Sequence, residues 1–152
     1  MNNSTETIKE IIEKLLEIMG FSAIVEMKNK EPENIVANIV SSEASYLIGH
    51  KGSNLYALQH LARLAVSRKL GENYKDFILD VNGYRKDRAE IIKELALSKA
   101  EQATREKRDI IFQPMSPYER RIVHVVLADN RNIICESEGE GEERHIVIKP
   151  AA

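Results

Sequence analysis

The stretch Leu47-Ile48-Gly49-His50-Lys51-Gly52 stands directly before a helix-like run over residues 53–70. Two glycines separated by two polar residues allow the backbone to bend closely against a flat or charged surface. The first turn of a helix leaves N–H groups unpaired and carries a partial positive charge, and both features favour an anion. The stretch therefore predicts either a phosphate-binding turn, to which Lys51 adds a mobile charge, or an ordinary tight turn between two helices.

The composition is that of a folded protein. The 152 residues are 43% hydrophobic, and four prolines and seven glycines are too few for a disordered chain. No apolar run approaches the roughly 20 residues that cross a bilayer, and residues 1–7 are too polar for a secretory signal. We therefore expect a soluble, cytoplasmic protein without a transmembrane segment.

The net charge of -2 hides a segregation of charge along the chain. Residues 1–43 carry four basic and eight acidic side chains, and residues 136–152 carry two and five. Residues 44–135 carry sixteen basic and eleven acidic side chains. The cations gather around the glycine stretch and downstream of it, which favours local binding of a short strand over wrapping of a duplex.

Metal and thiol chemistry receive little support. The single cysteine, Cys135, lies in an apolar run and is typical of a strand residue in a reducing compartment. The histidines show no zinc-like spacing with it, so we expect no metal and no cofactor. They are His50, His60, His124 and His145.

The first half of the chain predicts alternating helices and strands. Apolar residues from Ile8 to Met19 recur at three- and four-residue spacing and predict a core helix that ends at Gly20. The Asn82-Gly83 pair is a turn signal after an alternating strand pattern. The expected elements are a helix over 8–19, strands over 21–27 and 34–40 joined by a loop over 28–33, helices over 42–48 and 53–70, and a strand over 77–81.

The second half predicts a long helix and a smaller α/β unit, which places the chain in the α+β class. A helix from Tyr84 to about Lys107 is expected to turn its apolar residues inward. Ser116, Pro117 and Glu119 form a strong helix start, with an N-cap, a first-position proline and a third-position acid. The inward residues expected in the long helix are Ile91, Ile92, Leu95, Ala96 and Ala103. The later elements are a strand over 109–113, a helix to about 128, and strands over 132–136 and 144–149 around an acidic loop.

The order of these elements resembles two known modules. Residues 1–83 resemble a prokaryotic-type (type II) KH domain, with the GxxG turn between two helices. Residues from about 109 to 149 resemble an R-three-H domain, whose Arg-x-x-x-His signature is met by Arg120 and His124. This pair, in this order, is similar to the bacterial SpoIIIJ-associated (Jag) family of RNA-binding proteins. The resemblance implies a KH domain over 1–83, then a linking helix and an R-three-H domain over 84–152.

The resemblance implies that single-stranded RNA is the partner, with single-stranded DNA as the alternative. KH loops clamp the backbone of about four nucleotides. Gly49 and Gly52 would then allow close backbone approach, while His50 and Lys51 would contact phosphate. Ile48 and Leu55 would either offer an apolar floor for unstacked bases or pack in the core.

Arg120 and His124 are four residues apart, so on a helix both project from one face. A guanidinium there can grip a phosphate and an imidazole can donate a hydrogen bond or stack, near a helix N-terminus that also favours anions. The alternative is a surface arginine beside a half-buried histidine. Arg121 is expected to point elsewhere on the helix.

An enzyme is not expected. The GxxxxGK[ST] phosphate loop is absent, and a nuclease that used His124 as general base would lack an identifiable carboxylate or lysine partner. The resemblance implies post-transcriptional regulation linked to cell elongation, division or sporulation. The competing function is a protein-interaction module that forms a homodimer or recruits a small single-KH protein and binds little RNA itself. Family members commonly carry a further small domain ahead of the KH module, so the chain is expected to be a fragment or a short member.

Overall fold

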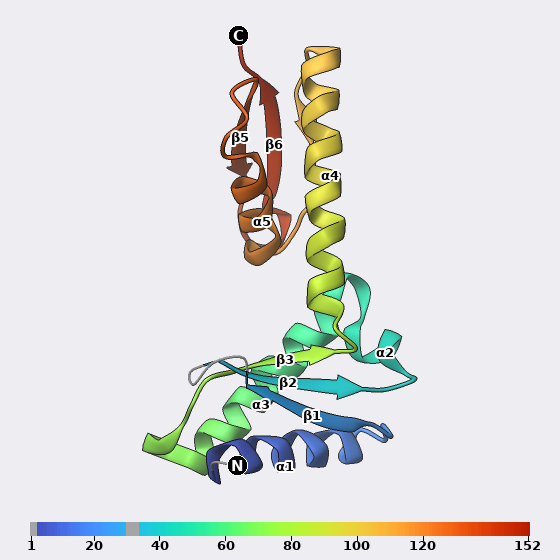
Figure 1. The fold of residues 1–152 in the computed structure, drawn as a ribbon, viewed down its shortest axis with the longest axis vertical. Helices are drawn as coiled ribbons and strands as arrows, with labels where there is room; N and C mark the ends of the chain where they lie inside the picture. Colours follow the sequence, from blue (N-terminus) through green and yellow to red (C-terminus); the bar gives the residue numbers. More distant parts are fainter. Residues whose placement is uncertain (1–2, 30–33) are drawn as a thin grey trace. The chain divides into compact units, whose positions relative to one another are not determined.

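The computed structural model describes residues 3–29 and 34–152, which form two compact units, residues 1–85 and 86–152. The loop expected over residues 28–33 lies mostly outside the described residues. Both units combine helices with a small sheet, which confirms the α+β class (Figure 1). Within the described residues, no helix has the length and apolar character that crossing a membrane requires.

The first unit contains a three-stranded sheet in the order β1-β2-β3. β1 and β2 pair antiparallel, whereas β2 and β3 pair parallel. The elements follow the order expected from the sequence. They are α1 (Asn3–Ile18), β1 (Ile24–Asn29), β2 (Ile35–Val40), α2 (Ala44–Ile48), a 3-10 turn (His50–Gly52), α3 (Ser53–Leu70), a second 3-10 turn (Gly71–Asn73) and β3 (Phe77–Val81).

The core of this unit lies between the sheet and two helices. α1 contacts β1, α3 contacts β3, and the two helices contact each other (Figure 1). α1 buries Ile8, Ile12 and Leu16 on one face, as the apolar spacing predicts. Met19 was expected in that stripe but is 43% exposed, because it follows the last helical residue.

The side chain of Gln59 connects α3 to the edge strand β3. Its Oε1 accepts the Leu79 N–H at 3.0 Å, and its Nε2 donates to the Phe77 carbonyl at 3.4 Å. β3 has β2 on one side only, so these backbone groups lie at the free edge of the sheet. The nearly buried carboxamide therefore supplies hydrogen bonds that a neighbouring strand would otherwise supply.

The second unit is built on α4 (Tyr84–Glu106), whose first two residues belong to the first unit. Its sheet has the order β4-β6-β5, with both pairs antiparallel. The strand expected over 109–113 is only two residues long. The remaining elements are β4 (Ile110–Ile111), α5 (Pro117–Leu127), β5 (Ile133–Glu138), a 3-10 turn (Gly141–Glu143) and β6 (His145–Pro150).

The face of α4 that enters the core differs in part from the expected one. Ile91 and Leu95 are 54% and 38% exposed, so their prediction as inward residues was wrong. The helix instead buries a stripe of mostly small residues in the core of this unit. Apolar spacing alone cannot choose between these two overlapping stripes. The buried stripe consists of Ile92, Ala96, Ala100 and Ala103.

α5 begins as the sequence predicts. The Ser116 Oγ accepts the Glu119 N–H at 3.2 Å, and Pro117 is the first helical residue. The Glu119 carboxylate turns to α4, where the Arg88 Nε donates to it at 2.6 Å. α5 is therefore fixed at its first turn, immediately before Arg120.

Candidate nucleic-acid interfaces

The GxxG turn joins α2 to α3 through backbone that is mostly left-handed. Gly49, Lys51 and Gly52 have φ of 70°, 51° and 82°. The ψ of Gly49, -174°, combines with its positive φ in a conformation that is essentially restricted to glycine. The chain therefore changes direction sharply just before the first residues of α3.

A side chain at either glycine would also press on neighbouring side chains within the unit. A Cβ at Gly49 would lie 2.5 Å from the Cγ of Asn54, whose Nδ2 donates to the Tyr46 carbonyl at 2.8 Å. A Cβ at Gly52 would lie 3.0 Å from Tyr84 Cε1 and 3.2 Å from Tyr56 Cε2. The side chains between the two glycines are the exposed His50 and the half-buried Lys51.

The start of α3 suits an anion. Within the described residues, no side chain caps this helix and its first turn contains no acid. Leu55 is fully buried, so it packs in the core and offers no floor to a base. Ile48 is half-buried and packs against the same core.

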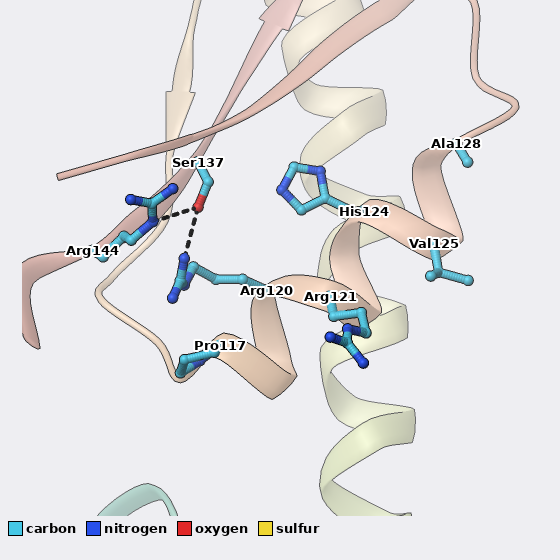
Figure 2. Close-up of a pocket in the computed structure, with 8 residues that line it drawn as sticks. All are labelled: Pro117, Arg120, Arg121, His124, Val125, Ala128, Ser137 and Arg144. Carbon is cyan, nitrogen blue, oxygen red and sulfur yellow. Dashed lines mark hydrogen bonds between the residues drawn. The ribbon is translucent and has the colours of Figure 1, made fainter. Parts of the chain in front are cut away.

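A second surface lies in the second unit, where α5 faces β5 and β6. Arg120 and His124 lie on the same side of α5, as their spacing predicts, and line an open depression of about 460 Å³ (Figure 2). Among the described residues, the eight that line it include no carboxylate. The lining residues are Pro117, Arg120, Arg121, His124, Val125, Ala128, Ser137 and Arg144.

Two arginines of this depression share one acceptor. The Ser137 Oγ accepts from Arg120 Nη1 at 3.0 Å and from Arg144 Nε at 3.3 Å (Figure 2). Arg144 also donates from Nη1 to the Gly139 carbonyl at 3.4 Å. Two guanidiniums are therefore held beside one neutral hydroxyl, an arrangement whose positive charge favours an anion such as a phosphate.

The sequence did not reveal Ser137 and Arg144. They lie in the hairpin, and only the packing of α5 on that hairpin brings them to Arg120. Arg121 does line the depression, but Figure 2 shows its guanidinium turned away from Ser137. Arg121 was expected to point elsewhere on the helix. Its guanidinium does so, but the residue still lines the depression.

Two other kinds of chemistry, metal binding and thiol reactivity, depend on the His, Cys, Asp and Glu side chains of the described residues. Residues 3–29 and 34–152 contain no group of three or more His, Cys, Asp or Glu side chains that could hold a metal. Cys135 is half-buried, and burial, with a smaller effect of the Glu136 charge, raises the pKa of its thiol. A raised pKa leaves less reactive thiolate at neutral pH.

The sequence is similar to known proteins. Residues 90–150 match the R-three-H domain family. The chain is similar to proteins named RNA-binding protein KhpB from Clostridium symbiosum, 33% identical over 91% of this chain, and from Bacillus subtilis (strain 168), 37% identical over 86%. These alignments cover 63% and 62% of the relatives, so the chain spans a little under two thirds of their length.

Proposed function

We propose that this chain is a member of the Jag family and binds single-stranded RNA through two surfaces. The match to the R-three-H domain and the similarity to relatives named RNA-binding protein KhpB support this proposal. One is the GxxG turn of residues 49–52, in a KH module over residues 1–83. The other is the depression of the R-three-H domain in the module over residues 84–152. The protein acts by binding and not by catalysis.

The observation that carries this proposal is the pair of arginines on Ser137. Phosphate oxygens accept strong, charge-assisted hydrogen bonds from guanidinium groups. Arg120 and Arg144 already have defined orientations, so little side-chain entropy is lost when a phosphate binds. His124, in the same lining, adds a ring that can donate a hydrogen bond or stack on a base.

The turn supplies the second contact. His50 and Lys51 lie at the start of the uncapped helix α3, whose first N–H groups and partial positive charge favour a phosphate. Such contacts fix the position of the RNA backbone without selecting its sequence. Single-stranded DNA has the same phosphates and is expected to compete.

The R-three-H surface is tested by measuring the affinity for a fluorescently labelled single-stranded RNA by anisotropy at several salt concentrations. The double variant Arg120→Ala/Arg144→Ala is expected to bind at least tenfold more weakly. Its salt dependence should be shallower by about one unit of slope for each phosphate that is no longer bound. Arg131→Ala removes an exposed cation outside the depression and should bind like the parent. Parent-like affinity of the double variant would contradict the R-three-H contact.

The turn is tested without touching its glycines. His50→Asp/Lys51→Asp reverses the local charge, and aspartate tolerates the left-handed conformation at position 51 better than most residues. The matched control, His60→Asp/Lys69→Asp, makes the same charge change at two exposed positions of α3. We expect the first variant to lose RNA affinity at least tenfold and the control to lose much less. Equal losses would mean that the effect is general charge and not the turn.

The competing proposal is a protein-interaction module that forms a homodimer or recruits a small single-KH protein. It predicts that all of these variants leave RNA binding weak and unchanged, while mixing with such a protein shifts the elution volume in size-exclusion chromatography. For the wider role we propose post-transcriptional regulation linked to cell elongation, division or sporulation. Crosslinking and sequencing of bound RNA in cells would identify the transcripts.

A further inference from the structure

Planar side chains gather on the α3 side of the GxxG turn. The rings of Tyr56 and Tyr84 both reach Gly52, within 3.0–3.2 Å of the position that a Cβ would take there. Arg85 lies over the ring of Tyr56, with its Cζ 5.2 Å from the ring centroid. A stack of a tyrosine and an arginine therefore stands directly beside the turn.

The guanidinium of Arg85 is held in a fixed orientation. Its Nε donates to the Leu79 carbonyl at 2.8 Å, and its Nη2 donates to Gln59 Oε1 at 2.6 Å. The ring of Tyr56 supplies a third restraint through a cation–π contact. Unlike most surface arginines, this side chain has little rotamer freedom left to lose when something binds to it.

The charge of Arg85 is not neutralised by these partners. The guanidinium donates to a backbone carbonyl and to a carboxamide oxygen, and both acceptors are neutral. The ion pairs found among the described residues do not include Arg85. The residue is only half-buried, so part of the side chain remains accessible. The Asp80 carboxylate accepts the backbone N–H of Arg85 at 3.2 Å, but no ion pair of the described residues joins it to the guanidinium. A planar, immobilised cation beside the turn fits a ligand that has a flat base and an anionic backbone.

We propose that the Tyr56–Arg85 stack is a nucleobase-stacking subsite. The inference rests on the proposed function, because it places the base next to the phosphate held at the turn. Bases released from a helical stack bind to the planes of arginine guanidiniums as well as to aromatic rings. The base extends the stack by one layer, so that Arg85 lies between Tyr56 and the nucleobase. Because every base has a flat face, the subsite contributes affinity with little sequence preference.

The first test uses the unaltered protein and a series of RNAs, each with a single abasic position. Removal of the stacked base at one position should weaken binding by about tenfold, within the range expected for loss of one stacked base, while other positions change it much less. The phosphates are intact throughout the series, so the electrostatic contribution is constant. If no position matters in a parent that binds intact RNA, the subsite is excluded.

The second test uses Arg85→Lys, which keeps the charge and removes the plane. We expect its affinity for intact RNA to fall about tenfold while the slope of affinity against salt stays that of the parent. It should also bind the intact RNA and the critical abasic RNA equally. Arg68→Lys, at an exposed position of α3, is the matched control and should discriminate between the two RNAs as the parent does.

Retained discrimination in Arg85→Lys would overturn the subsite. If circular dichroism shows that this variant is unfolded, Tyr56→Leu replaces it, with Tyr56→Phe as the ring-retaining control that should bind normally. Failure of the proposed function has a different signature: the parent would not bind RNA, or His50→Asp/Lys51→Asp would bind like the parent.

Discussion

Arg88 donates from Nε to the carboxylate of Glu119 at 2.6 Å, and the Glu119 side chain is only 3% exposed. The pair links α4 to the first turn of α5, one residue before Arg120. A buried carboxylate is costly unless a cation and hydrogen bonds compensate it. The position of the R-three-H surface therefore depends on an ion pair that does not itself line the depression.

Replacing Arg88 with alanine should strongly destabilise the second unit, because Glu119 would remain buried without its partner. We expect a loss of about 3 kcal/mol or more in the free energy of unfolding, measured by urea denaturation. Arg105→Ala, which removes an exposed ion pair with Glu106, should cost less than about 1 kcal/mol. Similar losses in the two variants would show that the Glu119 carboxylate finds other partners.

Removing the hydroxyl of Ser137 should loosen both arginines that donate to it. Ser137→Ala deletes the common acceptor of Arg120 and Arg144, so we expect RNA affinity to fall severalfold while the fold is retained. Ser137→Thr keeps a hydroxyl and should restore most of the affinity. Anisotropy titrations compare the two, and equal affinity of the alanine and threonine variants would remove Ser137 from the binding surface.

Gly52 and Gly20 separate the cost of backbone conformation from the cost of steric contact. Their φ angles are 82° and 81°, but a Cβ at Gly20 would have no heavy atom within 4 Å, whereas one at Gly52 would press on Tyr84 and Tyr56. Gly20→Ala should therefore lose only the left-handed penalty of about 1–2 kcal/mol. Gly52→Ala should lose clearly more in thermal unfolding. Equal losses would mean that the two rings move aside freely.

The thiol of Cys135 should react slowly with alkylating reagents. Burial raises its pKa, so the fraction present as thiolate at a given pH is smaller than for an unhindered cysteine. The alkylation rate with iodoacetamide, followed by mass spectrometry, should rise at higher pH in the folded protein than in the same protein in urea. Coincident pH profiles would contradict the raised pKa.

Local signals in the sequence predicted the elements well. α3 begins at Ser53 and ends at Leu70 as expected, because the GxxG turn precedes it and Gly71 follows it. The hairpin of β5 and β6 was also expected, since two apolar runs flank a glycine-rich acidic loop.

Long-range contacts were not predictable in the same way. The meeting of Arg120 with Arg144 depends on how α5 packs against the hairpin, and no local pattern encodes that packing. The positions of Gln59 and Arg85 at the edge of β3 likewise depend on tertiary contacts across the first unit. For Leu55 the sequence left two roles open, contact with an unstacked base or packing in the core. The structure shows that Leu55 is fully buried, so it packs in the core.

The carboxamide of Gln59 also has a consequence for behaviour at high concentration. An open strand edge is a template on which another chain can add a strand, and such additions lead to domain swapping and aggregation. At β3 the Leu79 N–H and the Phe77 carbonyl are already engaged by a side chain of the same unit. Arg63 and Arg85 also donate to the Phe77 and Leu79 carbonyls. An incoming strand would first have to displace these side chains and Gln59, so side chains of the first unit protect this edge against strand addition.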